Sequence, residues 1–170
     1  MYKQFKSVYP NFSELVEQCK SLAEQHGNWE FNWDSQIAIQ TDDSIENWLA
    51  GTGKSVAKTA EWEHSFCYLQ PSLKGTAIED YMKWLDVPVF RTRIMLARPK
   101  SCYSIHKDYS PRLHLPLVTN TECNFLLTDP LQMFHLPADG TTTWVDTRNR
   151  HTAMNGSTDP RLHLVMIVKE

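Results

Sequence analysis

Two histidines and an aspartate have the spacing of a mononuclear metal site in this sequence. His106 and Asp108 stand two residues apart, so their side chains point the same way if the backbone there is extended. His151 follows 45 residues after His106 and supplies a second imidazole. Two imidazoles and one carboxylate can bind Fe(II) and leave coordination positions open. Because a surface His-x-Asp pair is usually only solvated, the iron prediction depends on the residues that accompany it.

An arginine accompanies the second histidine. Arg161 follows His151 by ten residues and lies in an apolar segment near the carboxyl end of the sequence. A buried guanidinium needs an anionic partner, and its planar fork can bind a carboxylate through two hydrogen bonds. We therefore expect Arg161 to bind the carboxylate of a co-substrate.

The pentapeptide that contains this arginine has a counterpart earlier in the sequence. Pro111-Arg112-Leu113-His114-Leu115 returns as Pro160-Arg161-Leu162-His163-Leu164. On a strand, the arginine and the histidine of each copy face one side and the leucines face the other. Two strands could thus direct cations into one cavity, although chance resemblance explains the repeat equally well. We expect His163 itself to be a core histidine with a hydrogen-bond partner.

Together these motifs resemble the aspartyl/asparaginyl β-hydroxylase branch of the Fe(II)- and 2-oxoglutarate-dependent dioxygenases. The resemblance covers roughly residues 90–170. It implies a double-stranded β-helix, or jelly roll, and the cofactors Fe(II), 2-oxoglutarate and O2. His106, Asp108 and His151 would then hold the iron, and no catalytic residue is expected beyond these metal ligands.

The same resemblance assigns the contacts to 2-oxoglutarate. Arg161 would pair with its distal carboxylate, and the Arg-x-His motif of this branch, here Arg112 and His114, would contact it as well. Asp108 departs from the vertebrate hydroxylases, which carry glycine there, and agrees with relatives that act on free amino acids such as proline. Met95 stands where those vertebrate enzymes have a serine that touches the co-substrate. The identity of the substrate is therefore not transferred by the resemblance.

These observations predict an enzyme that hydroxylates an amino-acid side chain, either in a free amino acid or in a peptide. One alternative is a noncatalytic jelly-roll binding module. Such a module has no reason to keep the two histidines, the aspartate and the arginine together. A second alternative is an oxygenase that acts on another small metabolite.

Four further residues near the predicted ligands are candidates for a supporting contact or for substrate binding. Asp146 could hydrogen-bond His151, and Arg148 could meet an acidic substrate; Trp144 and Tyr109 complete the set. An ordinary turn, a core position or a solvated side chain accounts for each of them about as well.

The elements expected to position these residues divide the chain into two parts. Residues 1–88 have helical and mixed patterns, and residues 89–170 have short alternating segments separated by turns. We predict a single, mainly β domain over residues 1–170, in which a jelly-roll core carries the metal site and the N-terminal helices brace one face.

Each expected element follows from a local pattern. Helices are expected over residues 11–26, 43–50 and 76–85, with an extended segment over 28–40 and a loop over 51–75. Strands are expected over residues 89–97, 112–118, 123–127, 133–136, 141–145 and 161–168. Turn dipeptides at Asp129-Pro130 and Asp139-Gly140 suggest that the run from residue 123 to residue 145 forms successive hairpins.

One short segment imitates a phosphate-binding loop. Gly51-Thr52-Gly53-Lys54-Ser55 resembles the end of that motif, but Trp48 stands where the motif needs its first glycine. Polar residues also precede the segment where a buried strand is required. We expect no nucleotide to bind at residues 51–55.

The composition excludes several classes of protein. The 170 residues include 17 Lys and Arg against 20 Asp and Glu, with no basic stripe, so nucleic-acid binding is not expected. No apolar run reaches the roughly 18 residues that cross a bilayer, and we expect no membrane partner and a cytoplasmic location. The four cysteines are far apart, which favours reduced thiols over a disulfide framework or a thiolate zinc site.

Overall fold

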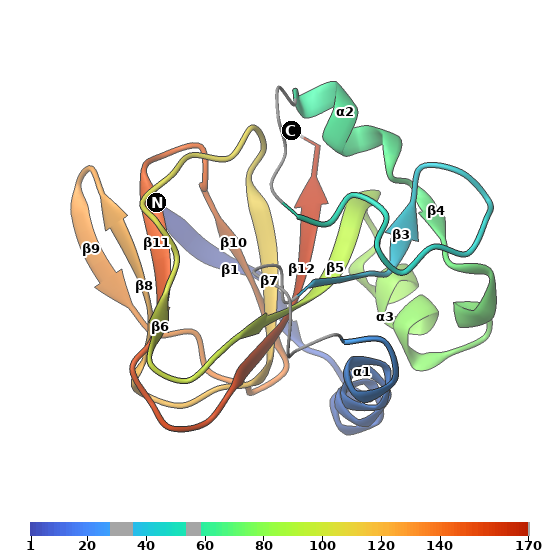
Figure 1. The fold of residues 1–170 in the computed structure, drawn as a ribbon, viewed down its shortest axis with the longest axis horizontal. Coiled ribbons are helices and arrows are strands. Elements are labelled where there is room, and N and C mark those ends of the chain that lie inside the picture. Colours follow the sequence, from blue (N-terminus) through green and yellow to red (C-terminus); the bar gives the residue numbers. More distant parts are fainter. Residues whose placement is uncertain (28–35, 54–58, 170) are drawn as a thin grey trace.

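The computed structural model describes residues 1–27, 36–53 and 59–169, and most of its strands form two antiparallel sheets that face each other (Figure 1). The six-stranded sheet has the spatial order β1 (Tyr2–Val8), β10 (Thr141–Val145), β7 (Arg112–Val118), β12 (Arg161–Val168), β5 (Val89–Ala97) and β2 (Gln36–Ala38). The four-stranded sheet has the order β6 (Ser101–Cys102), β11 (His151–Asn155), β8 (Cys123–Thr128) and β9 (Leu131–Phe134). A small separate sheet pairs β3 (Gln40–Thr41) with β4 (Tyr68–Leu69).

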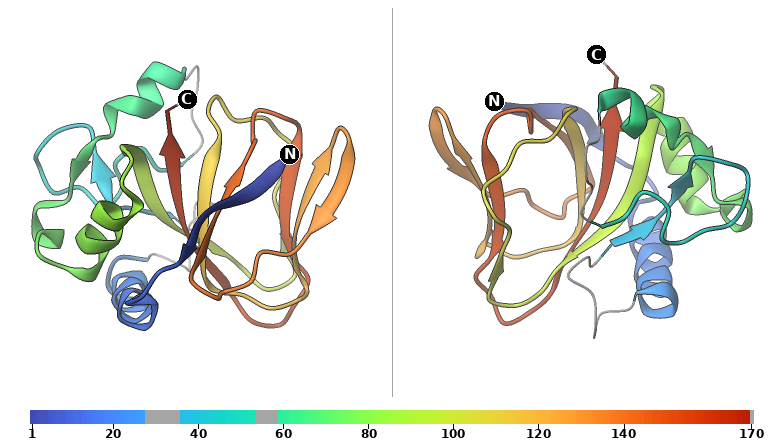
Figure 2. Two further views of the ribbon diagram at one scale, coloured as in Figure 1. Left: turned by 180° about the vertical axis from the view of Figure 1, so that it is seen from behind. Right: turned by 45° about the horizontal axis from the view of Figure 1, so that its top comes forward.

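The helices lie on the outer side of the six-stranded sheet, away from the four-stranded one (Figures 1 and 2). They are α1 (Phe12–His26), α2 (Ala60–Ser65), the 3-10 turn η1 (Pro71–Leu73) and α3 (Ala77–Leu85). The buried positions of α1 recur every three or four residues, and the helix ends at Gly27. The Gln18 side chain accepts a hydrogen bond from the backbone N–H of Ile78, so α1 also caps the start of α3. The helices expected over residues 11–26 and 76–85 are confirmed.

The central strands β7 and β12 have two different faces. Their alternate apolar residues pack under α1 and α3 in the main core; these are Leu113, Leu115, Leu117, Leu162, Leu164, Met166 and Val168. A second core lies between the sheets and contains Phe125, Leu127, Phe134, Leu136, Val145 and Ala153. The opposite face of β7 and β12 carries Arg112, His114, Arg161 and His163, which therefore point toward the four-stranded sheet.

The six strands expected in the second half of the chain are present, but β6 and β11 were not expected and one connection is wrong. β5, β7, β10 and β12 have the expected bounds, β8 is one residue longer and β9 lies two residues earlier. β8 and β9 form a hairpin, but β10 does not continue it. Instead, β10 belongs to the six-stranded sheet, where it pairs with β7 on one side and with β1 on the other. No strand had been expected at the position of β1. The expected series of hairpins is therefore wrong after β9.

The helix expected over residues 43–50 is also wrong. Bends and turns occupy this segment because side chains bind its backbone groups. Asp43 accepts from the N–H of Ile45, and Asn47 accepts from the N–H of Leu49. The Gln70 side chain bonds both the N–H and the carbonyl of Asn47. The expected loop over 51–75 is wrong in part, since it contains α2, β4 and η1.

Two sequence predictions fall partly on residues that the structure does not describe. Residues 28–35 of the expected extended segment and Lys54-Ser55 of the phosphate-loop look-alike lie outside the described residues. Among the residues that are described, no helix is long and apolar enough to span a bilayer.

The four cysteines are free and differ in exposure. Cys19 and Cys123 are buried, whereas Cys67 and Cys102 are exposed, and burial raises the pKa of the Cys19 thiol. We expect iodoacetamide at neutral pH to alkylate Cys67 and Cys102 in the folded protein and all four cysteines after unfolding. Intact-mass spectrometry counts the adducts. Alkylation of Cys19 in the folded protein as fast as Cys67 would contradict this assignment of burial.

Candidate active site

A backbone pairing brings the two predicted histidine ligands together. The N–H of His106 donates to the carbonyl of His151 at 3.0 Å, and the N–H of His151 donates back at 2.9 Å. Residues that exchange both hydrogen bonds in an antiparallel pair carry their side chains on the same face. The two imidazole centroids are accordingly 4.4 Å apart. This bridge joins the loop after β6 to the first residue of β11.

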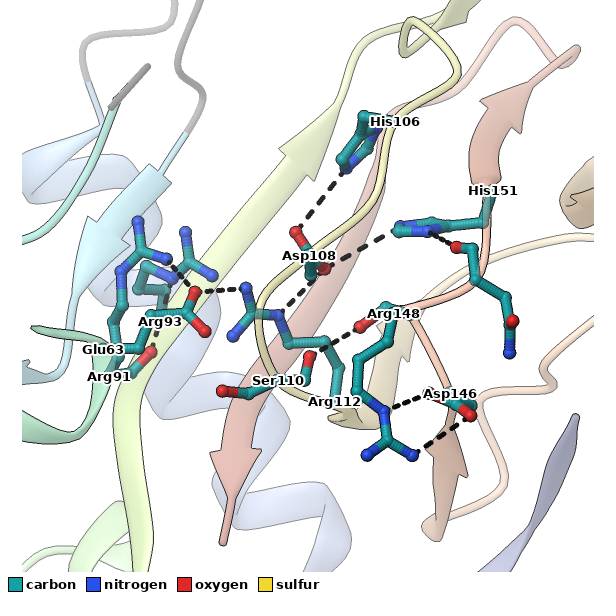
Figure 3. Close-up of polar contacts among 12 residues, drawn as sticks. Glu63, Arg91, Arg93, His106, Asp108, Ser110, Arg112, Asp146, Arg148 and His151 are labelled. Carbon is teal, nitrogen blue, oxygen red and sulfur yellow. Dashed lines mark hydrogen bonds and ion pairs between the residues drawn. The ribbon is translucent and has the colours of Figure 1, made fainter. Parts of the chain in front are cut away.

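The carboxylate reaches the same point from the loop before β7. The N–H of Asp108 donates to the carbonyl of Thr147 at 2.9 Å, which ties this loop to the segment that precedes His151. Asp108 Oδ1 lies 3.7 Å from His106 Nε2, and Oδ2 lies 3.8 Å from His151 Nε2 (Figure 3). One ligand atom from each of the three residues lies within 4.8 Å of the others. The predicted triad is thus assembled in space.

Both imidazoles are held with Nε2 toward the centre of the triad. His106 Nδ1 is 2.8 Å from the carbonyl oxygen of Ser104, and His151 Nδ1 is 2.9 Å from that of Asn149. A carbonyl can only accept, so each Nδ1 carries a proton, and in the neutral ring Nε2 keeps its lone pair. This tautomer is the one that a metal ligand needs. His151 is buried and His106 is exposed, so the triad opens to solvent beside His106.

The surroundings of the triad favour an ionised Asp108 and a neutral His151. Burial by itself would raise the pKa of Asp108, but the Arg112 guanidinium, together with His151 and His106, outweighs burial and holds that pKa well below its usual range. Burial is the main reason why the pKa of His151 is lowered, and Asp108 only partly opposes the shift. An ionised carboxylate and a neutral imidazole are the forms in which Asp108 and His151 can bind a cation.

A buried ionic network continues from the triad into the protein. Arg112 Nε donates to Asp108 Oδ2 at 3.0 Å, and Arg112 Nη2 donates to Glu63 Oε1 at 2.5 Å. Glu63 comes from α2, in the segment expected to be a loop, and its Oε1 also accepts from Arg91 Nη1 at 2.8 Å. Glu63 was not expected at the site, since nothing in Glu61-Trp62-Glu63-His64 distinguishes it from a surface acid.

A second cluster of polar residues, His114, Arg161 and His163, lies between the sheets on the inward faces of β7 and β12. The ring centroid of Phe125 is 4.8 Å from that of His114 and 5.6 Å from the guanidinium carbon of Arg161. The rings of His114 and His163 are 5.9 Å apart. All three polar residues are buried, yet both nitrogens of each histidine and Nε of Arg161 have no hydrogen-bond partner among the described residues.

The expectation that His163 has a hydrogen-bond partner is therefore wrong. Its cross-strand neighbours are Met95 and Pro116, which offer no side-chain oxygen to it. A buried polar group left without a partner costs about 1–3 kcal/mol. Such groups clustered on one interior surface call for a polar partner that the described residues do not supply.

The unpartnered histidines make a prediction about stability. Burial, reinforced by the charge of Arg161, lowers the pKa of His114 and of His163 well below the usual imidazole value. Below about pH 6.5 the unfolded chain protonates these histidines while the folded protein keeps them neutral. The free energy of unfolding therefore falls with decreasing pH, by up to about 1.4 kcal/mol per pH unit for each histidine.

We expect the unfolding temperature of the metal-free protein to decrease between pH 7 and pH 5. The decrease should be shallower in His163→Gln, which has no imidazole to protonate at this position. Differential scanning calorimetry measures both profiles. Parallel profiles would show that His163 is not held neutral by the fold.

The other four residues proposed from the sequence lie outside the cluster of three ligand atoms, and the structure gives them other surroundings. Trp144 is on the outer face of β10 in the main core, because alternation turns Val145 inward instead. Asp146 does not bond His151; its carboxylate accepts from Arg148 Nε at 2.7 Å and from Nη2 at 3.2 Å (Figure 3). Tyr109 follows Asp108 directly and is 55% exposed, which keeps it at the opening of the site.

The geometry agrees with a comparison of sequence families. The model of the aspartyl/asparaginyl beta-hydroxylase family matches residues 11–170. The chain belongs to this family. Membership and the assembled triad favour an enzyme over the noncatalytic binding module. The protein is a 2-oxoglutarate- and Fe(II)-dependent hydroxylase that uses Fe(II), 2-oxoglutarate and O2. No curated protein sequence matches the chain.

Solved structures share the fold of this hydroxylase at low sequence identity. A 2OG-Fe(II) oxygenase family protein from Burkholderia pseudomallei is 16% identical, with a TM-score of 0.51 over 89% of this chain and 76% of its own. AviO1 from Streptomyces viridochromogenes is 11% identical, with a TM-score of 0.55 over 99% and 89%. A prolyl-4-hydroxylase from Pseudomonas putida is 11% identical, with a TM-score of 0.54 over 99% and 92%. The jelly roll expected from the sequence is confirmed.

The residues present fit the expected cofactors. Two neutral imidazoles and an ionised carboxylate form the ligand set of a non-haem Fe(II) site. The unpartnered Nε of Arg161 and the unpartnered imidazoles beside it can donate to a carboxylate.

Proposed function

We propose that this hydroxylase oxidises a side-chain carbon of an amino acid, free or within a peptide, at iron held by His106, Asp108 and His151. The observation that carries the proposal is the convergence of the three ligand atoms within 4.8 Å. The two Nε2 lone pairs and one Asp108 carboxylate oxygen would hold the metal. The solvent side next to His106 stays open for the co-substrate, O2 and the substrate.

The co-substrate would extend inward from the metal. Arg161, whose guanidinium lies against Phe125, is proposed to pair with the distal carboxylate of 2-oxoglutarate. His163, two residues further on the same face of β12, would donate to the same group. His114 would contact the co-substrate nearer the metal. Arg112 was expected to do so as well; its Nη1 has no partner among the described residues, although its other edge is engaged by Asp108 and Glu63.

Iron with 2-oxoglutarate and O2 supplies oxidative decarboxylation coupled to insertion of an oxygen atom into a C–H bond. The residues of the chain orient the metal ligands and set the protonation state of Asp108. Ser104 and Asn149 carbonyls keep the imidazoles oriented, and Arg112 keeps Asp108 ionised. The apolar surroundings of Phe125 exclude water from the inner pocket and strengthen the pairing between Arg161 and a carboxylate.

The opening of the site suits a side chain presented from outside. Ile105 and Tyr109 flank the predicted ligands in sequence and are 49% and 55% exposed. Apolar surface beside a partly exposed metal site gives a substrate something to pack against while its reacting carbon approaches the iron. The family supports an amino-acid substrate, and both the free and the peptide-bound forms fit this proposal.

A substrate screen tests the proposal. The enzyme is incubated with Fe(II), 2-oxoglutarate and O2 and with aspartate, asparagine or proline, each free and within a short blocked peptide. We expect at least one of them to stimulate succinate formation and to gain one oxygen atom by mass spectrometry. If another small metabolite is hydroxylated but no amino acid in either form, the amino-acid substrate is refuted.

A further inference from the structure

Glu63 is a buried acid that the chemistry described so far does not use. It is 1% exposed and lies on the short helix α2, beside the start of β5. Its Oε1 accepts from Arg91 and from Arg112, and its Oε2 has no partner among the described residues. Figure 3 shows it on the side of Arg112 opposite Asp108. Burying a carboxylate is costly unless cations pair with it, so its presence here needs an explanation.

The Arg112 guanidinium is held from both sides. Nε donates to Asp108 Oδ2 at 3.0 Å and Nη2 donates to Glu63 Oε1 at 2.5 Å. A planar fork bound at two edges cannot rotate without breaking one of these hydrogen bonds. The position of Glu63 therefore sets the position of Arg112, and Arg112 in turn sets the direction of the Asp108 carboxylate.

We propose that Glu63 is a positioning residue for the metal centre and acts on Asp108 through Arg112. The proposal rests on the role of Asp108 as an iron ligand. In metal sites, groups that hydrogen-bond the ligands commonly change metal affinity by 10- to 100-fold when they are mutated. Glu63 does not bond the ligand directly, because Arg112 stands between Glu63 and Asp108. Glu63 itself lies on a helix outside the jelly-roll strands.

Charge adds to the effect of geometry. Arg91, Arg93 and Arg112 are all buried near the triad; Glu63, which is buried, pairs with Arg91 and Arg112, and Asp108, which is half-buried, pairs with Arg112. Neutralising Glu63 would leave three guanidinium cations with Asp108 as the remaining anion. A divalent cation would then compete with unbalanced positive charge for the same carboxylate. Orientation and charge both predict weaker metal binding without Glu63.

The other contact of Glu63 is structural and leads away from the metal. Arg91 Nε and Nη2 donate to the carbonyl of Gly51 at 3.0 and 2.6 Å, and its guanidinium lies 4.7 Å from the ring of Trp62. The Glu63–Arg91 pair thus fastens α2 to β5. Loss of this pair lowers stability without touching the triad, so the test must separate stability from metal binding.

The experiment measures Mn(II) binding to the metal-free full chain, without co-substrate, by electron paramagnetic resonance of the free ion. We expect Glu63→Gln to bind Mn(II) roughly tenfold more weakly than the wild type. Glu61→Gln removes the same charge from an exposed position on the same helix and should bind as the wild type does. Thermal unfolding of each variant records any loss of stability.

A second probe and a second variant complete the test. The visible spectrum of Co(II)-loaded Glu63→Gln should differ from the wild type, because a reoriented Asp108 changes the ligand field. If Glu63→Gln does not fold, Glu63→Asp replaces it, with weaker Mn(II) binding again expected since the shorter chain cannot hold Arg112 in place. Mn(II) affinity within twofold of the wild type in the folded variant would overturn the proposal.

Asp108→Asn distinguishes this inference from the proposed function. Weaker Mn(II) binding by Asp108→Asn together with unchanged binding by Glu63→Gln would refute the positioning role alone. Unchanged binding by both variants would remove Asp108 from the metal site and overturn both proposals.

Discussion

Replacing His151 by alanine is expected to abolish 2-oxoglutarate turnover. The side chain is buried, its Nδ1 is fixed by the Asn149 carbonyl, and its Nε2 lies 3.8 Å from Asp108 Oδ2. No other described imidazole can take its place, because the neighbouring His106 already provides its own Nε2. We expect Fe(II) affinity to fall by more than about 100-fold, beyond the usual effect of a residue that only supports a ligand. Succinate formation and Fe(II) binding measure the two effects separately.

His26→Ala is the matched control for this variant. His26 lies at the end of α1, stacked on Trp48 with ring centroids 4.0 Å apart, and has no part in the triad. Its removal should leave succinate formation unchanged. A His151→Ala protein that folds and retains wild-type turnover would remove His151 from the proposed ligand set.

Replacing Arg161 by alanine is expected to raise the concentration of 2-oxoglutarate needed for half-saturation while sparing iron binding. Truncating one partner of a buried charge pair costs about 2–5 kcal/mol, which corresponds to a loss of affinity of about 30-fold or more. The guanidinium is fully buried beside Phe125, and no acidic residue among those described pairs with it. Anaerobic titration of the Fe(II) protein with 2-oxoglutarate measures the change.

The keto acid 2-oxobutanoate makes this test specific, because it lacks the distal carboxylate. If Arg161 binds that carboxylate, Arg161→Ala should weaken binding of 2-oxoglutarate far more than binding of 2-oxobutanoate. An equal loss for both keto acids would mean that the substitution disturbs the pocket as a whole. Unchanged affinity for 2-oxoglutarate would mean that another cation binds the distal carboxylate.

The parts of the site that could be predicted from the sequence depend on local pattern. A two-residue spacing in an extended segment aligns His106 with Asp108, and alternation along β7 and β12 turns Arg112, His114, Arg161 and His163 inward. The bounds of these strands follow from their apolar residues and turns. Such features can be predicted from a short segment without the rest of the chain, which is why β7 and β12 have the expected bounds.

Contacts between distant segments could not be predicted. Glu63 reaches the site only because α2 packs against β5. The sequence of this six-residue helix contains no pattern from which the burial of an acid could be predicted. The surroundings of His163 depend on which residues face it across the fold, so the expectation that it has a hydrogen-bond partner was wrong. The turn at residues 43–50 forms because Gln70, far along the chain, binds the backbone of Asn47.

The most direct test of the central claim is anaerobic addition of Fe(II) and then 2-oxoglutarate to the metal-free protein, followed by visible spectroscopy. A keto acid chelated to Fe(II) gives a metal-to-ligand charge-transfer band. We expect the band in the wild type near one equivalent of Fe(II), and in Asp108→Ala only at much higher Fe(II). Folded wild-type protein that shows no band at saturating Fe(II) and 2-oxoglutarate would contradict the proposed site.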